Sequence, residues 1–434
     1  MNVRKNFILM VLLLFLFILG ACGDNDKGDN GSESANETDK EVELQFTTWG
    51  GDQHIEMYEV LLEEFYKEYP NIKVNIESIP HADYQQKLSV LAAGNELPDV
   101  GWVAERMVPQ FVDNDILIDI TDITERDGFD FDDFIPSTLE LWEHDGKLLG
   151  FPFSTPPMIM YYNKTMFDDA ELETPIELAK KGEWTWEQFE ESAKALSGGE
   201  GSERTFGARL FDEWTNFATI PSHTMSYGGD MFNDDMTSFE WNSEQGVESL
   251  NMLERMMFED GSHVPPGESI NFESGKVGMF TFMYSYIANL RDITDFEWDI
   301  APLPKGPEGR YPLLGQAGIS IFENSDHPEE AKLLLEFLAS KTGIQAQSQF
   351  FVPPRKSVLE SDEFVEVENN PPRESIEIAL IDEMNNGFTY PLHEDWTKIE
   401  NEIVNGFDKL FSQIESNEDI LEEMKQKINE ILKE

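Results

Sequence analysis

Two proline-rich stretches constrain the fold of this chain more than any other feature of its sequence. The first covers residues 146–170, where prolines at 152, 156 and 157 fix φ and remove backbone donors. The second covers residues 299–307 and holds three more prolines. Because neither stretch suits a helix or a regular central strand, we expect an extended crossover at each. Such crossovers suit hinges between two α/β lobes. For the first stretch, an ordinary loop before a strand is the alternative.

The residues upstream of the first crossover predict the α/β class. The expected elements are a strand at 42–46, a helix at 55–69, a strand at 72–76, a helix opened by a capping box at Asp83 and Gln86, and a strand at 98–103. This order predicts a mainly parallel sheet. Ligands of such sheets bind outside the carboxyl ends of the strands.

The pattern continues downstream. The unbroken apolar run at 158–162 predicts a strand buried on both faces. Thr185 and Gln188 form a capping box, which predicts that a helix begins at Trp186. Further elements are expected as a helix at 243–258, strands at 275–280 and 315–322, a helix opened by Asp326, Pro328 and Glu329, and helices at 396–410 and 420–432.

The N-terminus predicts export. Arg4 and Lys5 precede an apolar run at 7–20, which is short for a membrane-spanning helix of about 20 apolar residues. The ending Leu19-Gly20-Ala21-Cys22 resembles a bacterial lipobox, in which the cysteine becomes the lipid-modified first residue. We therefore expect a lipoprotein signal peptide at 1–22. Cys22 is the only cysteine, so disulfides are excluded. Residues 23–40 lack apolar groups and are expected to form a disordered tether.

The charge balance excludes several partners. The formal net charge is -55, and the leader carries two basic residues and no acids, so the mature chain is more negative still. This field repels nucleic acid and anionic lipids, and it disfavours anionic ligands that lack a local cationic pocket. We interpret the acidic surface as suited to a saline or alkaline habitat. An acidic stretch at 127–133 lacks EF-hand spacing, so a solvated loop is favoured over a calcium site.

Six motifs in order resemble the family 1 extracellular solute-binding proteins, which are the receptors of carbohydrate ABC importers. The motifs are the lipobox, Pro98-Asp99-Val100, the segment 146–164, Thr185-Trp186, Gly275-Lys276-Val277-Gly278-Met279 and Pro302-Leu303-Pro304-Lys305-Gly306. The resemblance covers essentially the whole mature chain. Each motif is weak alone, but their order over several hundred residues is a strong signal.

The resemblance implies a two-lobed, periplasmic-binding-protein-like α/β fold of type II, with two parallel or mixed sheets joined by hinge crossovers. Lobe I is expected at 41–152 and 302–342, and lobe II at 153–301 and 343–434. A carbohydrate would bind between the lobes, and hinge closure would present the loaded receptor to the permease subunits of the transporter. The chain is expected to be a non-enzymatic monomer, held at the extracellular face of the cell membrane by its lipid anchor alone, without cofactor or metal.

A sugar receptor needs aromatic plates for sugar faces and polar groups for the hydroxyl edges. In maltose-type members a Trp and an Asp follow the first strand, and Trp49 and Asp52 are similar to that pair. The set Trp102, Glu105 and Arg106 is similar to a second motif, although Trp102 suits the core equally well. Tyr284 and Tyr286, two apart, would face one side of a strand as stacking plates, and Gln316 would add an edge contact. The maltose receptors have tryptophans in place of Tyr284 and Tyr286 and a glutamate in place of Pro156, so the resemblance does not decide which sugar binds.

Other functions stay open at this stage. A secreted glycoside hydrolase needs a carboxylate pair, but 86 acidic residues make such pairs uninformative, and no H-E-x-x-H, G-x-S-x-G or G-x-G-x-x-G motif occurs. The same fold could instead bind a polyamine, a glycerol phosphate or an iron complex. Excess acid and aromatic residues suit a cation, whereas a phosphate would want a basic cluster that the sequence lacks. Arg355 is interpreted as a loop charge, and Trp214 and Trp396 as packing residues.

Overall fold

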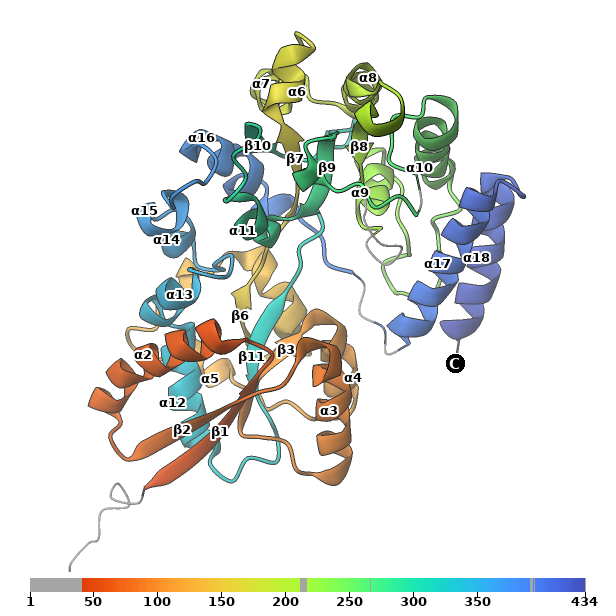
Figure 1. The fold of residues 1–434 in the computed structure, drawn as a ribbon. Helices are drawn as coiled ribbons and strands as arrows, with labels where there is room; N and C mark the ends of the chain where they lie inside the picture. The colour runs from red at the N-terminus through yellow and green to blue at the C-terminus, as the bar shows by residue number, and fades with distance from the viewer. Residues whose placement is uncertain (1–40, 211–216, 266, 391–392, 394, 434) are drawn as a thin grey trace, which may run out of the picture. The chain divides into compact units, whose positions relative to one another are not determined.

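Two β-sheets organise the part of the chain that the structure describes (Figure 1). The structure is a computed structural model, and it describes residues 41–433 except 211–216, 266, 391–392 and 394. The described residues form one compact unit. The signal peptide, Cys22 and the tether expected at 1–40 lie outside them, as does Trp214.

The first sheet is mixed and has the strand order β2-β1-β3-β11-β6. Its strands are β1 (Val42–Thr48), β2 (Ile72–Ser78), β3 (Val100–Ala104), β6 (Phe151–Ser154) and β11 (Ala317–Ile321). β1 pairs in parallel with β2 and β3, as the strand and helix order predicts. β11 runs antiparallel to both β3 and β6. β6 therefore points the same way as β3, and the carboxyl ends of β1, β3 and β6 meet at one edge.

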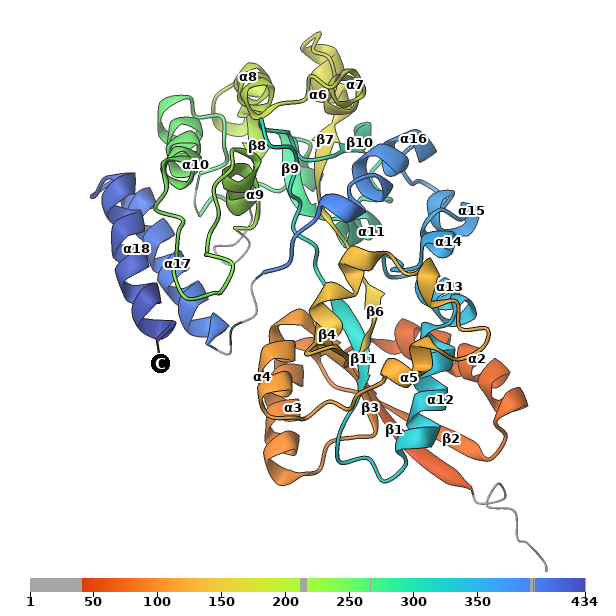
Figure 2. The same ribbon diagram turned by 180° about the vertical axis from the view of Figure 1, so that it is seen from behind.

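Helices cover both faces of the first sheet. In Figures 1 and 2, α2 (Asp52–Glu68) and α12 (Pro328–Ala339) lie on one face, and α3 (His81–Gly94) and α4 (Val108–Asp113) on the other. Two capping predictions were wrong. α3 begins directly after the extended Pro80, which leaves Asp83 in its first turn, and α12 is preceded by His327 rather than Asp326.

The second sheet has the order β10-β7-β9-β8. Its strands are β7 (Met158–Asn163), β8 (Phe206–Arg209), β9 (Val277–Met283) and β10 (Trp298–Ala301). Every residue of β7 is buried, which confirms the strand predicted from its unbroken apolar run. β7 runs antiparallel to β9 and β10, and β8 runs parallel to β9.

Helices of the second half confirm most of the predicted bounds. α8 (Trp186–Leu196) begins where Thr185 Oγ1 accepts from the backbone N of Gln188 at 3.3 Å. α10 (Glu244–Glu254) continues into one π-helical turn. The C-terminal helices α17 (Trp396–Ser412) and α18 (Asn417–Ile431) lie side by side in both ribbon views. Trp396 is buried in the core around them, as its interpretation as a packing residue requires.

The chain passes between the sheets through the two proline-rich stretches. Pro152 stands in β6, at the edge of the first sheet, where a missing donor is tolerated. A further segment returns at 348–361, where Thr155 N donates to Val352 O at 3.0 Å. The core of the first sheet extends past the expected boundary at 342, because Ile344 and Val358 belong to it.

Arg355 corrects one sequence interpretation. The residue is fully buried, so it is not a loop charge. Its guanidinium group donates to three backbone carbonyls and lies over the ring of Phe134, 4.2 Å from the centroid. It therefore fixes the returning segment to the first core.

Candidate functional site

A pocket of about 490 Å³ lies at the edge of the first sheet where strand ends converge. The carboxyl ends of β1, β3 and β6 meet there with the amino end of the antiparallel β11. This is the edge at which α/β sheets bind ligands. The side chains used below are Trp49, Glu105, Arg106, Ser154, Ser285 and Gln316, all of which line it. Ser285 lies in the 3₁₀ turn that follows β9, so segments next to both sheets contribute to the pocket.

Glu105 joins the ends of β3 and β11. Its backbone N donates to Gln316 O at 3.2 Å, and its Oε2 accepts from the backbone N of Gln316. Burial raises the pKa of Glu105, although this accepted bond and the nearby Arg106 oppose the rise. Arg106, the next residue, is exposed at the pocket. The pair therefore presents a carboxylate and a guanidinium group side by side.

The two tryptophans of the predicted site occupy different environments. Trp49 is half-buried, lines the pocket and packs edge-on against Trp102, with ring centroids 4.8 Å apart. Trp102 is 0% exposed, and its Nε1 donates to Tyr58 Oη at 3.1 Å within the first core. Trp102 is therefore a core residue, the alternative that the sequence analysis left open, and it packs against the Trp49 ring.

The prediction that Tyr284 and Tyr286 face one side of a strand was wrong. β9 ends at Met283, and Tyr284–Tyr286 form a 3₁₀ turn, in which residues two apart point in different directions. Tyr284 is buried, and Tyr286 donates to Glu273 Oε1. Ser285, between them, lines the pocket. Tyr161 Oη holds the turn by bonding to the carbonyls of Met283 and Tyr284 at 3.0 and 2.9 Å.

Half of the predicted site residues line the described pocket. Trp49, Glu105, Arg106 and Gln316 do so, whereas Trp102, Asp52, Tyr284 and Tyr286 do not. Asp52 is exposed as the first residue of α2. Sequence reasoning missed His81, Gln85, Ser154 and Ser285, which also line the pocket. Ser154 ends β6, which the sequence analysis treated as part of the extended crossover and not as a strand.

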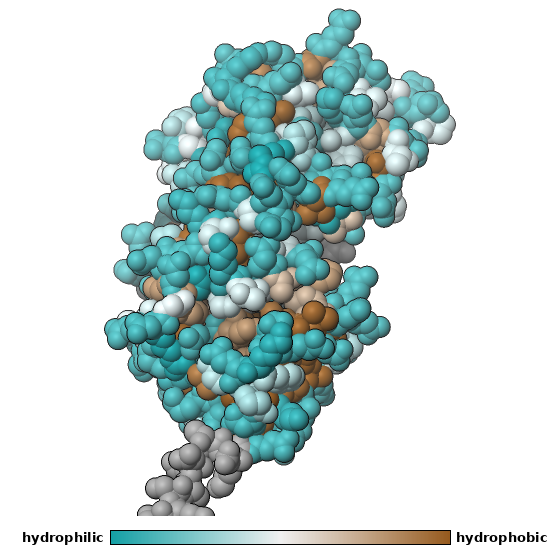
Figure 3. Space-filling model, turned by 90° about the vertical axis from the view of Figure 1, so that its left-hand side faces the viewer, coloured by the Kyte–Doolittle hydropathy of each residue, from teal (hydrophilic) through white to brown (hydrophobic). Residues whose placement is uncertain are grey.

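A larger hollow of about 1210 Å³ lies between α2 and α13 (Lys341–Gln347). The exposed Val60 and Val367 line it together with Glu56 and Glu63. Figure 3 views the side that bears these helices and shows apolar patches within a mostly hydrophilic surface. Because this hollow runs along the helices, away from the strand ends, the smaller pocket is the better candidate for a small-molecule site.

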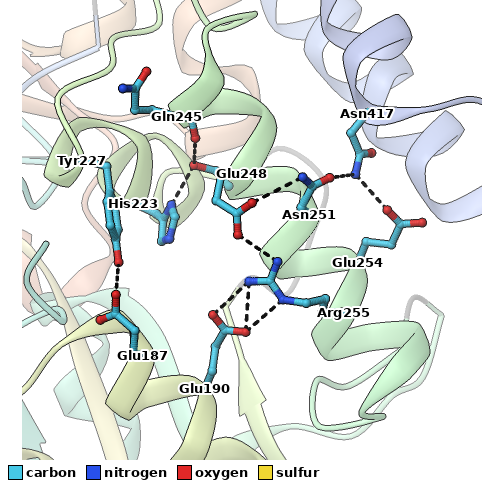
Figure 4. Close-up of polar contacts among 11 residues, drawn as sticks. Glu187, Glu190, His223, Tyr227, Gln245, Glu248, Asn251, Glu254, Arg255 and Asn417 are labelled. Atoms are coloured by element: carbon cyan, nitrogen blue, oxygen red, sulfur yellow. Dashed lines mark hydrogen bonds and ion pairs between the residues drawn. The ribbon is translucent and has the colours of Figure 1, made fainter.

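A polar cluster among α8, α9 (Thr219–Ser226), α10 and α18 contains a second group of side chains with chemical potential (Figure 4). His223 Nδ1 lies 2.7 Å from Ser249 Oγ, a pairing that hydrolases use. Both residues are buried, and Ser249 Oγ is engaged with Gln245 O at 2.9 Å and Thr224 Oγ1 at 2.6 Å. A substrate could not reach the pair, so the cluster serves packing. Beside it, ion pairs and hydrogen bonds from amide side chains connect six residues: Glu190, Glu248, Asn251, Glu254, Arg255 and Asn417.

We expect His223→Gln to change the pH dependence of stability. Burial lowers the pKa of His223 to about 3, from an ordinary value near 6.5. Between these values the unfolded chain takes up a proton that the folded chain does not, so the contribution of His223 is lost as pH falls, by about 1.4 kcal/mol per unit. From pH 8 to 4.5, urea unfolding should show the advantage of wild type over the variant shrinking by about 2–3 kcal/mol. His144→Gln, at an exposed site, is the control. A constant difference across this range would contradict the prediction.

No helix among the described residues is both long and apolar enough to span a membrane. No group of three or more His, Cys, Asp or Glu side chains among them is placed to hold a metal ion. In the acidic loop, Asp133 instead accepts from the backbone N of Ser357 at 2.9 Å and from its Oγ at 2.8 Å.

Comparison with known proteins gives one family match and many structural relatives. The bacterial extracellular solute-binding protein family matches residues 36–345. The arabinooligosaccharide-binding protein of Bacillus subtilis is 27% identical over 459 aligned residues, covering 97% of this chain and 98% of that protein. An ABC substrate-binding protein from Listeria monocytogenes, solved with cycloalternan, has a TM-score of 0.76 at 23% identity, covering 91% and 100% of the two chains. The sugar-binding protein MalE from Xanthomonas citri has a TM-score of 0.76 at 20% identity, covering 90% and 98%.

Proposed function

Because this chain belongs to the bacterial extracellular solute-binding protein family, the non-enzymatic receptors of ABC importers, we propose that it binds a sugar or an oligosaccharide in the pocket at Trp49 and Gln316. The chain has the two-lobed α/β fold of periplasmic binding proteins, with two mixed sheets and flanking helices. A membrane permease is the partner that this family implies.

One observation carries the proposal for a sugar. The pocket combines an aromatic ring, Trp49, with the carboxylate of Glu105, the guanidinium group of Arg106 and the amide of Gln316. Sugars present apolar C–H faces to aromatic rings, and their hydroxyl groups pair with charged and amide groups at the edges. The volume of about 490 Å³ lies within the ordinary range for small-molecule sites.

The relatives support a carbohydrate as the class of ligand. The Bacillus subtilis protein is named for arabinooligosaccharides, and the Listeria monocytogenes protein was solved with cycloalternan. Arabinose oligomers are therefore the first ligands to test. A second receptor class, for polyamines, has less support from the pocket because Arg106 lines it.

The proposal includes the lobes and the anchor. We assign lobe I to 41–152 and 302–342 and lobe II to 153–301 and 343–434. The boundary at 342 is the least sharp, because Ile344 and Val358, which follow it, pack in the core of the first sheet. Closure about the crossovers would bury the sugar. Cys22 would carry the lipid that holds the receptor at the extracellular face of the cell membrane.

We expect sugars to raise the melting temperature of a protein that starts at residue 41. A ligand at 100 times its Kd should stabilise the folded state by about 2.7 kcal/mol, a shift of a few degrees. Arabinotriose, maltotriose, spermidine and glycerol 3-phosphate form the panel, and calorimetry confirms each hit. A saturable shift with a sugar that is recovered intact supports the proposal. A response to spermidine or glycerol 3-phosphate alone would overturn it.

A further inference from the structure

We propose that Trp142 holds the Gln316 amide in one orientation, so that Gln316 Nε2 is a fixed hydrogen-bond donor reserved for an oxygen of the ligand. The inference rests on the proposed function, because it concerns the same pocket. It adds a positioning residue, Trp142, which lies outside the pocket lining described above, and a requirement on the ligand at one position.

Trp142 is held in place by two glycines. The residue is 0% exposed within the first core. A Cβ atom at Gly150 would lie 2.6 Å from the indole ring, and one at Gly318 would lie 2.4 Å from it. Side chains at these positions would therefore displace the ring. The two glycines leave a slot that the indole fills, which fixes the direction of its N–H group.

The indole N–H group of Trp142 fixes the orientation of the Gln316 side-chain amide. Trp142 Nε1 lies 3.0 Å from Gln316 Oε1. Because an indole N–H group can only donate, the carbonyl side of the amide must face it, and the NH₂ side must face away. Gln316 is 4% exposed, and its Nε2 has no hydrogen-bond partner among the described residues. A buried donor without a partner costs free energy, which a ligand acceptor at the pocket would remove.

The backbone of Gln316 is also held in place beside the pocket. Both backbone groups of Gln316 are bonded to Glu105, so the residue is fixed at the amino end of β11. The pairing of β11 with β6 shifts register between Ala317 and Gly318, directly after Gln316. Such bulges occur beside binding sites, where they redirect a side chain. The bulge thus places Gln316 at the pocket and Gly318 against Trp142.

A fixed donor restricts the class of ligand. Hydroxyl, ring and carboxylate oxygens accept a hydrogen bond, whereas a fully protonated polyamine offers only donors. At this position a sugar satisfies Gln316 Nε2, and a polyamine leaves it unpaired. The arrangement therefore selects against the cationic ligand class that the sequence alone left open.

A double-mutant cycle tests the inference. Gln316→Met removes the donor at nearly constant volume, and Trp142→Phe removes the N–H group that orients it. Calorimetry with arabinotriose, and with maltotriose in parallel, should show about a tenfold weaker affinity for Gln316→Met. Trp142→Phe should weaken binding several-fold, and the double variant should bind like Gln316→Met within about twofold, because Trp142 acts through Gln316.

Controls separate this inference from the proposed function and from misfolding. Gln349→Met, at an exposed site on the surface, controls for the substitution. If Trp142→Phe melts too low, benzothienylalanine at position 142 removes the N–H group and keeps the ring shape. Additive losses, or an unchanged affinity of Gln316→Met, would overturn the inference while wild-type binding upholds the proposed function. If wild type binds neither sugar, the proposed function fails, and the inference fails with it.

Discussion

Replacing Arg355 with methionine should lower the free energy of unfolding by about 3–5 kcal/mol. The guanidinium group donates to Ala339 O at 2.8 Å, Asp130 O at 2.8 Å and Phe129 O at 2.9 Å, and it lies 3.4 Å from Asp133 Oδ2. Methionine fills much of the volume but leaves these buried acceptors without a donor, and each unmade bond has its own cost. Urea unfolding of the protein from residue 41 gives the measurement.

The neighbouring residue supplies the control. Lys356 has the same charge, but its side chain is 70% exposed, and its Nζ lies 4.0 Å from Glu360 Oε1. Lys356→Met should change stability by less than about 0.5 kcal/mol. Arg355→Lys should fall between the two, since lysine keeps the charge but its single nitrogen cannot take the places of the three guanidinium nitrogens that donate here. A loss below about 1 kcal/mol for Arg355→Met would mean that Arg355 contributes little to the first core.

Arg355 also shows where sequence reasoning stopped. The run Pro353-Pro354-Arg355-Lys356 has the composition of a loop, and nothing local distinguishes the arginine from the lysine after it. Two of its carbonyl partners, those of Phe129 and Asp130, lie more than 220 residues away in the chain. Tertiary contacts of this kind leave no periodic pattern. By contrast, β7 and α17 were predicted from patterns within themselves, because burial of a strand or a helix face imposes its own spacing.

The residues of the candidate site also fall into those that the sequence predicted and those that depend on tertiary contacts. Trp49, Glu105 and Arg106 follow the ends of β1 and β3, so strand order and the family resemblance both pointed to them, and they line the pocket. Tyr284 and Tyr286 were misplaced because β9 ends at Met283 and a 3₁₀ turn follows it. That change depends on the tertiary hydrogen bonds from Tyr161. The family resemblance supplied the overall fold, but the identity of each lining side chain depended on local geometry.

Replacing Trp49 with alanine should weaken sugar binding about a hundredfold, equivalent to about 2.7 kcal/mol. Trp49 is half-buried and lines the pocket with its ring braced by Trp102 at 4.8 Å and Tyr84 at 5.0 Å. Alanine removes the apolar plate for the sugar face and lets water reach the rings behind it. Because the bracing residues fix the ring before ligand arrives, little conformational entropy is lost on binding, which raises the contribution of the ring.

Two companion variants distinguish a stacking role from a general disturbance of the fold. Trp49→Phe keeps a flat ring, so its affinity for arabinotriose should fall by about tenfold or less. Trp298→Ala removes a half-buried tryptophan from β10, at the edge of the second sheet, and should leave affinity within about twofold of wild type. Calorimetry is run well below the melting temperature of every variant, so that unfolded protein does not enter the comparison. Equal losses for Trp49→Ala and Trp298→Ala would assign the effect to stability, and an unchanged affinity of Trp49→Ala would remove this residue from the sugar site.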